Sequence, residues 1–315
     1  MFSQLVSAPD LETLLAGLSR SAAPHEGLFG PRSISWKINR ESALFLAAGR
    51  AALLQLAHPW VAAAITEHSR TLNDPAARFH RTFRVIFTMV FGSLEQALSA
   101  SRQLHRLHQG IKGVLPDTVG PFGQGTAYDA NEVGALRWVY ATLVDSALVA
   151  YELVLPPLTD AEREQYFQDS LKMAALFGIA PQYLPASWLE FNTYLESILQ
   201  SDVLGVSVST RRLAQQLQAG VGLLKPPVWY QALTVQLLPP RVREQFELTY
   251  GERERNAAER GLRWLKRIYP KLPSAMRYVG PYNEARIRMA GKAPGVSVRL
   301  SNRVWVGQPK LFTTE

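Results

Sequence analysis

Residues 75–92 read PAARFHRTFRVIFTMVFG, and the spacing of the apolar side chains in this stretch decides the fold class. These side chains recur at intervals of three and four residues, which places them on one side of an α-helix: Phe79, Phe83, Ile86 and Val90. The same period continues along most of the 315-residue chain, whereas alternation at period two is scarce. The sequence therefore predicts an all-α protein.

Eleven helices are expected from this periodicity, at residues 10–20, 40–57, 60–69, 75–92, 94–113, 131–153, 159–176, 187–200, 209–220, 227–237 and 239–267. Some of them have recognisable start signals. Thr159 and Glu162 have the spacing of a capping box. Asp74 before Pro75 predicts an N-cap followed by proline at the first helical position. Asn131 and the glutamate after it predict another helix start.

The chain is expected to form one large helical domain. We place this domain at residues 30–270, after a helical extension at 1–29 and before a basic extension at 271–315 that is packed on or draped over it. Glycine and proline are frequent in residues 112–126, which predicts a loop. Weak alternation at residues 296–306 predicts a short hairpin or an extended tail.

Composition excludes several classes of site. The sequence contains no cysteine, which excludes disulfides, thiolate-bound zinc, iron–sulfur clusters, cysteine nucleophiles and covalently attached haem. The net charge is +8, and from Arg241 onward there are 16 Lys and Arg against 7 Asp and Glu. A solvated helix face with an extended tail accounts for this imbalance, and the alternatives are contact with nucleic acid, with an anionic membrane or with an acidic substrate. No nucleic-acid-binding motif is present, so we expect no nucleic-acid partner.

No targeting segment is predicted. Residues 1–17 contain no Lys or Arg and so lack the charged start of a signal peptide. The most hydrophobic stretch, residues 43–66, is interrupted by Arg50, His58 and Pro59, which are unfavourable in a bilayer. We therefore expect a soluble, cytoplasmic protein.

A second stripe on the helix at residues 75–92 carries polar groups beside apolar ones. Arg78, Arg81 and Thr82 share this stripe with Val85 and Met89, a quarter turn from the first stripe. Two guanidinium groups and a hydroxyl next to an apolar strip suit a pocket for an anion attached to an apolar body. The alternative is two surface arginines on an amphipathic helix.

Two more side chains stand out because they are polar among apolar neighbours. His108 lies on an apolar arc of its helix, where it is either a buried core histidine or a neutral axial ligand for haem iron. Asp145 is the one charged residue between Trp138 and Tyr151. A buried carboxylate needs a partner, so we expect Asp145 to meet an arginine or a histidine N–H. Glu67 is a candidate general base or distal pocket group.

Several short segments occur in an order that is characteristic of one protein family: Trp36, Arg40-Glu41, Gly49-Arg50, Leu54-Gln55-Leu56-Ala57-His58-Pro59-Trp60-Val61-Ala62, His68-Ser69, Arg78-Phe79-His80-Arg81-Thr82, His108-Gln109-Gly110-Ile111-Lys112-Gly113, Tyr128-Asp129-Ala130, Trp138-Val139 and Thr142-Leu143. Together they resemble the catalytic domain of the family that contains the ER-bound oxygenase MpaB and the rubber oxygenase (latex-clearing protein). The resemblance covers residues 30 to 270.

The resemblance implies an all-α catalytic domain with a globin-like core around haem b. In the latex-clearing branch one histidine is the proximal iron ligand, and His108 matches it. An Arg-x-x-x-Thr element near the haem matches Arg78 and Thr82. A distal lysine of that branch falls at Arg81, and arginine is a poor iron ligand because it stays protonated. Glu67 is the nearest match for the catalytic glutamate.

The expected function is that of a haem b-dependent oxygenase. It would use O₂ to cleave or oxidise a carbon–carbon double bond in an apolar substrate of the isoprenoid or lipid-like class. His108 would bind the iron, and Arg81 and Thr82 would stabilise charge on bound oxygen. Arg78 would hold a haem propionate, and Asp145 would orient a neighbouring group. Two alternatives are a non-catalytic haem or apolar-ligand-binding protein and a helical module at a membrane surface.

Overall fold

The computed structural model describes residues 4–68, 75–220 and 225–311 of the chain. In these residues the helices are α1 (Ala8–Ser21), α2 (Ile34–Asn39), η1 (Ser42–Ala47), α3 (Ala48–Leu56), α4 (Pro59–His68), α5 (Pro75–Phe91), α6 (Leu94–Gln109), α7 (Val133–Val154), α8 (Asp160–Leu176), η2 (Pro181–Tyr183), α9 (Trp188–Gln200), α10 (Val208–Ala219), α11 (Val228–Gln236), α12 (Pro240–Gln245), α13 (Glu252–Ile268), η3 (Tyr269–Lys271), α14 (Ser274–Arg277), α15 (Gly280–Met289) and α16 (Val296–Val306). Two short strands, β1 (Lys112–Val114) and β2 (Ala127–Asp129), form an antiparallel pair. The predicted all-α fold class is confirmed.

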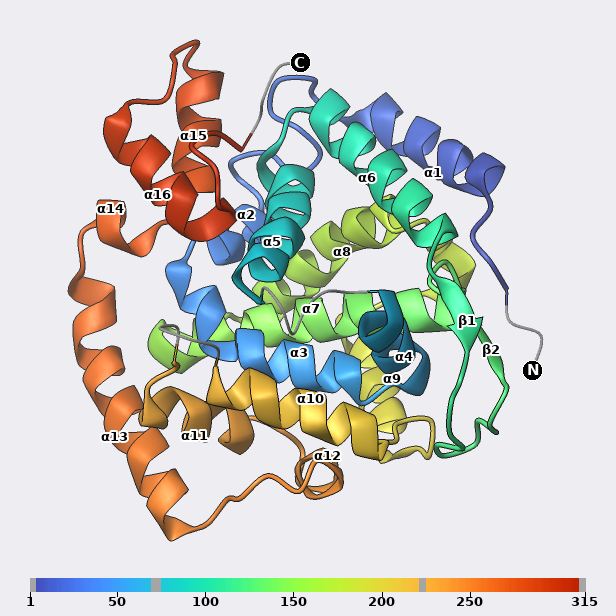
Figure 1. Cartoon of the computed structure of the whole chain (residues 1–315). Coiled ribbons are helices and arrows are strands. Elements are labelled where there is room, and N and C mark those ends of the chain that lie inside the picture. Colours follow the sequence, from blue (N-terminus) through green and yellow to red (C-terminus); the bar gives the residue numbers. More distant parts are fainter. Residues whose placement is uncertain (1–3, 69–74, 221–224, 312–315) are drawn as a thin grey trace.

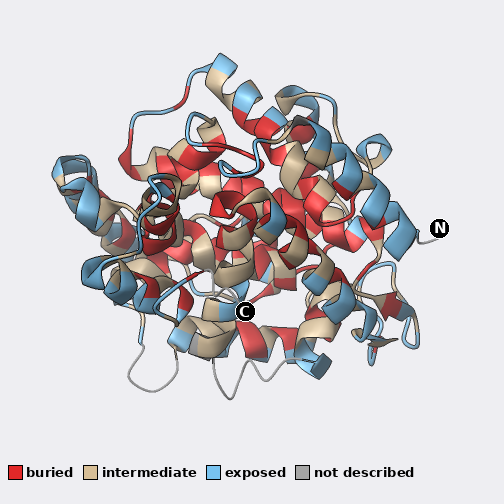
Figure 2. Ribbon diagram, turned by 90° about the horizontal axis from the view of Figure 1, so that it is seen from above, coloured by how far each residue is buried: buried red, intermediate tan, exposed pale blue. Residues whose placement is uncertain are grey.

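Helix α7 lies at the centre of the protein (Figure 1), where η1, α2, α3, α8 and α13 pack against it. Most of its side chains are buried, in keeping with the buried centre and exposed periphery in Figure 2. Among the described helices, α7 is the one that is long and apolar enough to cross a membrane, and 67% of its most apolar window is buried inside the protein.

The first stripe of α5 faces the core as predicted, and two of its phenylalanine rings form a ladder with Phe87, which the prediction did not include. Phe79, Phe83 and Phe87 follow one another with ring centroids 4.6 and 5.6 Å apart. Phe45 of η1 packs against this ladder, with its ring centroid 4.7 Å from that of Phe83. Trp305 of α16 stacks on the Phe45 ring at 4.4 Å. The ladder thus joins α5, η1 and the C-terminal helix α16 in one core.

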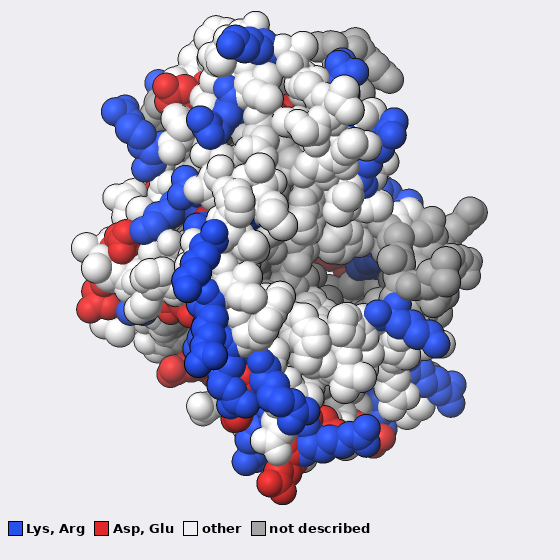
Figure 3. Space-filling model, turned by 90° about the vertical axis from the view of Figure 1, so that its left-hand side faces the viewer, with Lys and Arg blue, Asp and Glu red and all other residues white. Residues whose placement is uncertain are grey.

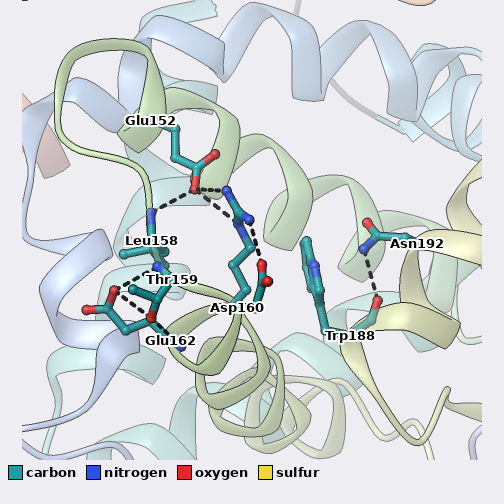
Figure 4. Close-up of polar contacts among 8 residues, drawn as sticks. Glu152, Leu158, Thr159, Asp160, Glu162, Trp188 and Asn192 are labelled. Atoms are coloured by element: carbon teal, nitrogen blue, oxygen red, sulfur yellow. Dashed lines mark hydrogen bonds and ion pairs between the residues drawn. The ribbon is translucent and has the colours of Figure 1, made fainter.

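The connection between α7 and α8 contains the predicted capping box (Figure 4). The Glu162 carboxylate accepts the backbone N–H of Thr159 at 2.9 Å, and the Thr159 hydroxyl accepts the N–H of Glu162 at 3.2 Å. Glu152, in the last turn of α7, accepts hydrogen bonds from the backbone N–H of Leu158 and from Arg163. These contacts fix the angle at which α8 leaves α7.

Other predicted starts are also found. Helix α5 begins at Pro75, and Asp74, its predicted N-cap, lies outside the described residues. Helix α7 begins at Val133, slightly later than predicted, because Glu132 is its N-cap and accepts the N–H of Ala135 at 2.7 Å.

Three predicted helices are interrupted. The helix predicted at 40–57 is divided into the 3₁₀ helix η1 and the α-helix α3. The helix predicted at 94–113 ends at Gln109, because Gly110 closes α6 and the following residues pair as β1 with β2. The helix predicted at 239–267 is divided into α12 and α13, since Glu247 adopts a left-handed conformation with φ of 53°. Gly251 then starts α13, where its N–H donates to the Glu254 carboxylate at 2.9 Å.

The C-terminal prediction of a hairpin or tail is wrong, because residues 296–306 form α16. Its buried side chains, Asn302 and Val306, are four residues apart, which is the spacing of a helix and not of a strand. Gly307 ends the helix in the left-handed conformation with φ of 72°. Together with α15, this helix packs on α5.

Candidate haem-binding and catalytic site

Helices α5 and α6 form a hairpin, so the first turns of α5 and the last turn of α6 lie at the same end of the pair. Gly92 and Ser93 connect the helices, and Ser93 caps α6 by accepting the N–H of Gln96. From this connection the two helices diverge (Figure 1), which leaves their far ends apart above α7. The predicted site residues of both helices are at these far ends.

The second stripe of α5 changes from polar to apolar along the helix. Arg81 and Thr82 are exposed, Val85 is half-buried and Met89 is fully buried. Arg78 is half-buried, and burial together with repulsion from Arg81 lowers the pKa of its guanidinium group. The stripe therefore offers charged donors at its exposed end and an apolar surface at its buried end.

His108 is a neutral imidazole in the last turn of α6. Burial, with a smaller contribution from His105, lowers its pKa to about 4, and Asp129 and a hydrogen bond between the His108 ring and the Asn131 side chain oppose this shift. Asn131 is itself fixed, since its side-chain N–H donates to the carbonyl of His105 at 3.3 Å and its backbone N–H donates to Asp129 at 2.8 Å. The ring is thus oriented by one partner and uncharged at neutral pH.

A second cluster surrounds Glu67 in the last turn of α4. The buried phenol of Tyr128 donates to the Glu67 carboxylate at 2.5 Å. Burial and the neighbouring carboxylate raise the pKa of Tyr128, so this donor keeps its proton at neutral pH. His68 Nε2 lies 3.2 Å from the carbonyl oxygen of Lys112 and 4.0 Å from Glu67 Oε2. A Cβ atom on Gly113 would lie 2.7 Å from both Glu67 Oε2 and the Tyr128 hydroxyl oxygen, so a larger residue here would displace this hydrogen-bonded pair of side chains.

The β1–β2 hairpin connects the two clusters. Neighbouring residues of a strand face opposite sides, so Tyr128 reaches Glu67 on α4 whereas Asp129 interacts with His108 on α6. Within the described part of the chain, no hydrogen bond or ion pair joins Glu67 directly to His108. Glu67 and His108 are therefore brought to the same hairpin and not into contact.

Asp145 meets an arginine, as predicted, and this partner is Arg50. Arg50 Nη2 lies 2.6 Å from Asp145 Oδ2, and both side chains are buried. The guanidinium group also donates to the Ser146 hydroxyl at 2.7 Å and to the Leu237 carbonyl at 3.0 Å. Asp145 lies 12 residues after Val133, the first residue of α7, which is about 18 Å along the helix axis. It therefore holds Arg50 and not a group next to His108.

His58 is a buried polar group that the sequence reasoning did not select. It is 5% exposed, burial lowers its pKa to about 4, and its Nδ1 atom has no hydrogen-bond partner. The ring packs near Trp60 and Phe122, while the His58 carbonyl accepts the N–H of Ala62 at the start of α4. Its place within the apolar stretch 43–66 was the available signal. Asn131 and Tyr128 gave no such signal, because their partners are on other elements.

A small cavity lies on the other side of α5. It has a volume of about 80 Å³ and is lined by the first stripe of α5 together with η1, α7 and α8. This is well below the roughly 300 Å³ of the smallest common ligand sites. Its lining includes none of the predicted site residues. In the described ranges no group of three or more His, Asp or Glu side chains could hold a metal ion.

These features define a helical protein with one supported neutral histidine, a line of cationic and hydroxyl donors on α5 and a carboxylate fixed by a tyrosine. The family is identified by comparison with known proteins. Residues 36–267 match the family described as ER-bound oxygenase mpaB/B′/Rubber oxygenase, catalytic domain, and the chain belongs to this family. Its class is therefore that of an oxygenase catalytic domain. Comparison with curated proteins and with solved structures gives no match.

Proposed function

We propose that this protein is a haem b-dependent oxygenase that uses O₂ to cleave or oxidise a carbon–carbon double bond in an apolar substrate of the isoprenoid or lipid-like class. Family membership supports the oxygenase class. The observation that carries the haem assignment is His108, an imidazole kept neutral by burial and hydrogen-bonded to Asn131. Metal-binding histidines are commonly oriented in this way by a second hydrogen-bond partner.

The residues present fit haem b. The macrocycle supplies four nitrogen ligands to the iron, so a protein needs to add only one axial ligand. A neutral imidazole has the free electron pair that this ligand requires, and His108 is neutral at pH 7. Arg78 offers a partly desolvated guanidinium group for a propionate, with which it would form a charge-assisted pair. His108 and Arg78 would therefore hold the cofactor.

Haem b supplies, when bound, an iron centre at which O₂ is activated. Arg81 and Thr82 carry N–H and O–H donors on the exposed side of α5, and such donors stabilise negative charge that develops on oxygen. Arg81 acts here as a donor and not as an iron ligand, since a guanidinium group stays protonated. The apolar end of the same stripe, at Val85 and Met89, would contact an apolar substrate.

Glu67 is the proposed proton acceptor. Tyr128 occupies Glu67 Oε2 and fixes the carboxylate, while the side chain remains on the exposed side of α4. Cleavage of a double bond by O₂ to two carbonyl groups places one oxygen atom on each carbon and needs no further electrons. Proton transfer to and from Glu67 can therefore return the site to its starting state.

The haem assignment is tested by the visible spectrum and the pyridine haemochrome assay on protein expressed with ample haem supply. We expect stoichiometric haem b in the wild type and in His25→Ala, a control at an exposed histidine. His108→Ala should lose haem and regain a Soret band when imidazole is added. Full haem occupancy with an unchanged spectrum in His108→Ala would refute the axial assignment.

The oxygenase step is tested separately by O₂ consumption with an unsaturated isoprenoid such as squalene. We expect uptake by the haem-loaded wild type, with carbonyl products, and a large loss in Thr82→Val and Glu67→Gln at unchanged haem content. A haem-loaded protein that consumes no O₂ with any unsaturated substrate would contradict the catalytic proposal and support a non-catalytic haem-binding role.

A further inference from the structure

Exposed apolar side chains are concentrated on the C-terminal helices. Of the eleven large hydrophobic residues that are exposed in the described ranges, six are on α11, α13, α14 and α16: Val228, Trp264, Met276, Val296, Leu300 and Val304. The other five are distributed over elements from the N-terminal segment to α10. A group of this kind on one side of a protein marks an interaction surface.

Helix α16 presents an apolar stripe to solvent. Val296, Leu300 and Val304 are four residues apart, so they lie along one side of the helix, and they are 73%, 55% and 63% exposed. Arg299 and Arg303 are exposed beside this stripe. The helix therefore has a second apolar side, in addition to the one that packs on α5.

Helix α13 has a comparable arrangement. Arg253, Arg260 and Arg267 are seven residues apart and exposed, which places them along one line of the helix. Trp264 lies next to this line and is 61% exposed. A groove of about 480 Å³ lies beside it, between α13 and the start of α11, with Val228 among its lining residues. Indole, aliphatic and guanidinium groups thus alternate along this surface.

The same region is strongly basic. Residues 251–311 contain 14 Lys and Arg against four Asp and Glu, and residues 285–311 contain no acidic residue. On α13 and α16, as far as these helices are described, the one ion pair is between Arg263 and Glu259. The positive charge of α13 and α16 is therefore available to a partner, whereas Arg277, outside these two helices, is already paired with Glu41.

The two helices belong to one continuous surface. Helix α14 follows α13 and η3 after two residues, and it shares a groove with α15 and α16 whose lining includes Ala275 and Val298. Figure 3 shows the side of the molecule on which Figure 1 places α13, α14, α15 and α16. Lys and Arg form a band across its lower half and lie around its upper half, with Asp and Glu along the left edge and beside the lower end of the band.

We propose that this surface, formed by α13, α14 and α16 with the start of α11, docks the protein on an anionic lipid membrane. The arginines would lie at the level of the lipid headgroups, and Trp264 and the Val296–Leu300–Val304 stripe would enter the interface below them. Tryptophan is favoured at this depth because its ring is apolar and its N–H is polar.

The chemistry of the surface favours lipid over nucleic acid. Phosphate backbones are bound by Lys and Arg with polar side chains, and exposed aliphatic residues add nothing to that contact. An anionic membrane uses both kinds of group, because it attracts the Lys and Arg side chains and accepts the apolar ones. The proposal is independent of the proposed enzymatic function.

The test is cosedimentation of the full chain with vesicles of phosphatidylcholine alone and with about one third phosphatidylserine, in low and high salt. We expect binding to the anionic vesicles that weakens at high salt. Arg253→Glu/Arg260→Glu/Arg267→Glu should lose at least about tenfold in affinity. The matched control is Arg20→Glu/Arg32→Glu/Arg212→Glu, which changes the net charge equally at exposed arginines outside this surface and should lose less than about twofold.

A second measurement follows Trp264 directly. Brominated lipid should quench the tryptophan fluorescence of the wild type more than that of Trp264→Phe, in which the exposed indole is absent. Equal losses in the two triple variants would show that only net charge matters and would overturn the proposal. So would absence of vesicle binding, or equal quenching in wild type and Trp264→Phe. Tighter binding to duplex DNA than to anionic vesicles would assign the surface to nucleic acid instead.

Discussion

Replacing Asp145 by asparagine should destabilise the protein strongly, because the change leaves a buried positive charge without its counter-charge. The asparagine of this variant would keep the size of the side chain, and Arg50 would keep its hydrogen bonds to Ser146 and the Leu237 carbonyl. The pair with Asp145, at 2.6 Å between buried side chains, would lose its attraction. Breaking a buried pair from one side costs about 3–5 kcal/mol.

The remaining hydrogen bonds of Arg50 place the expected loss at the low end of this range, at about 3 kcal/mol. For a chain of this length, the entropy of unfolding is about 0.7 kcal/mol per kelvin, so Tm should fall by about 5 °C. The assay is urea denaturation of wild type and Asp145→Asn, with the midpoint and the slope followed separately. The double variant Asp145→Asn/Arg50→Met should lose less free energy of unfolding than the sum of the losses in the two single variants, because it no longer contains the uncompensated Arg50 charge.

A matched control separates burial from geometry. Arg102 forms an equally good pair with Glu12, with N–O distances of 2.7 and 2.8 Å, but the side chains are 40% and 52% exposed. Glu12→Gln should therefore leave the midpoint almost unchanged. If Asp145→Asn and Glu12→Gln shift the midpoint equally, water reaches the Arg50–Asp145 pair and the reasoning is wrong.

Three further predictions concern pH, packing and the C-terminal helices. Burial lowers the pKa of His58 to about 4. The unfolded chain therefore binds a proton at His58 that the folded protein does not, and stability falls as the pH falls from about 6.5 toward about 4. The urea midpoint of His58→Gln should change less over this pH range than that of the wild type. Gly49→Ala should lower the free energy of unfolding by about 1–3 kcal/mol, although alanine favours helices, because the alanine Cβ would lie 2.6 Å from Thr234 Oγ1. Adding Thr234→Ala should restore most of this loss in urea denaturation. A more stable Gly49→Ala protein would contradict the packing. Arg277 reaches both Glu41 carboxylate oxygens, at 2.6 and 3.1 Å, so Glu41→Gln should loosen the chain from α14 onward. Mass spectrometry of limited trypsin digests should show faster cleavage after residue 269. Unchanged cleavage rates would show that α14, α15 and α16 stay docked without this pair.

Local patterns in the sequence determined much of the fold. The three- and four-residue spacing of Phe79, Phe83, Ile86 and Val90 identified the core side of α5, and Thr159 with Glu162 identified the start of α8. These features depend on neighbours within one turn of helix, so a single segment contains the whole signal. For Asp145 the sequence determined only part of the answer: its apolar surroundings predicted a partner of the arginine or histidine type.

The identity of that partner was decided by the tertiary structure. Arg50 and Asp145 are 95 positions apart, and nothing between them in the sequence distinguishes Arg50 from other arginines. The same holds for Asn131 at His108, which meet because the β1–β2 hairpin returns the chain to the end of α6. The break between α12 and α13 was not visible in the sequence either, since it occurs where Glu247 takes a left-handed conformation that its residue type does not predict.

The division between the two levels has a physical cause. Helical periods and caps are set by hydrogen bonds and side chains a few residues apart, so the sequence alone determined that this chain is all-α and which side of α5 is buried. From a charged or imidazole side chain among apolar residues, the sequence predicts only that a polar partner is needed, not which residue it is. Many residues satisfy that need equally well in sequence, and only close packing of the folded chain selects Arg50 for Asp145 and Asn131 for His108.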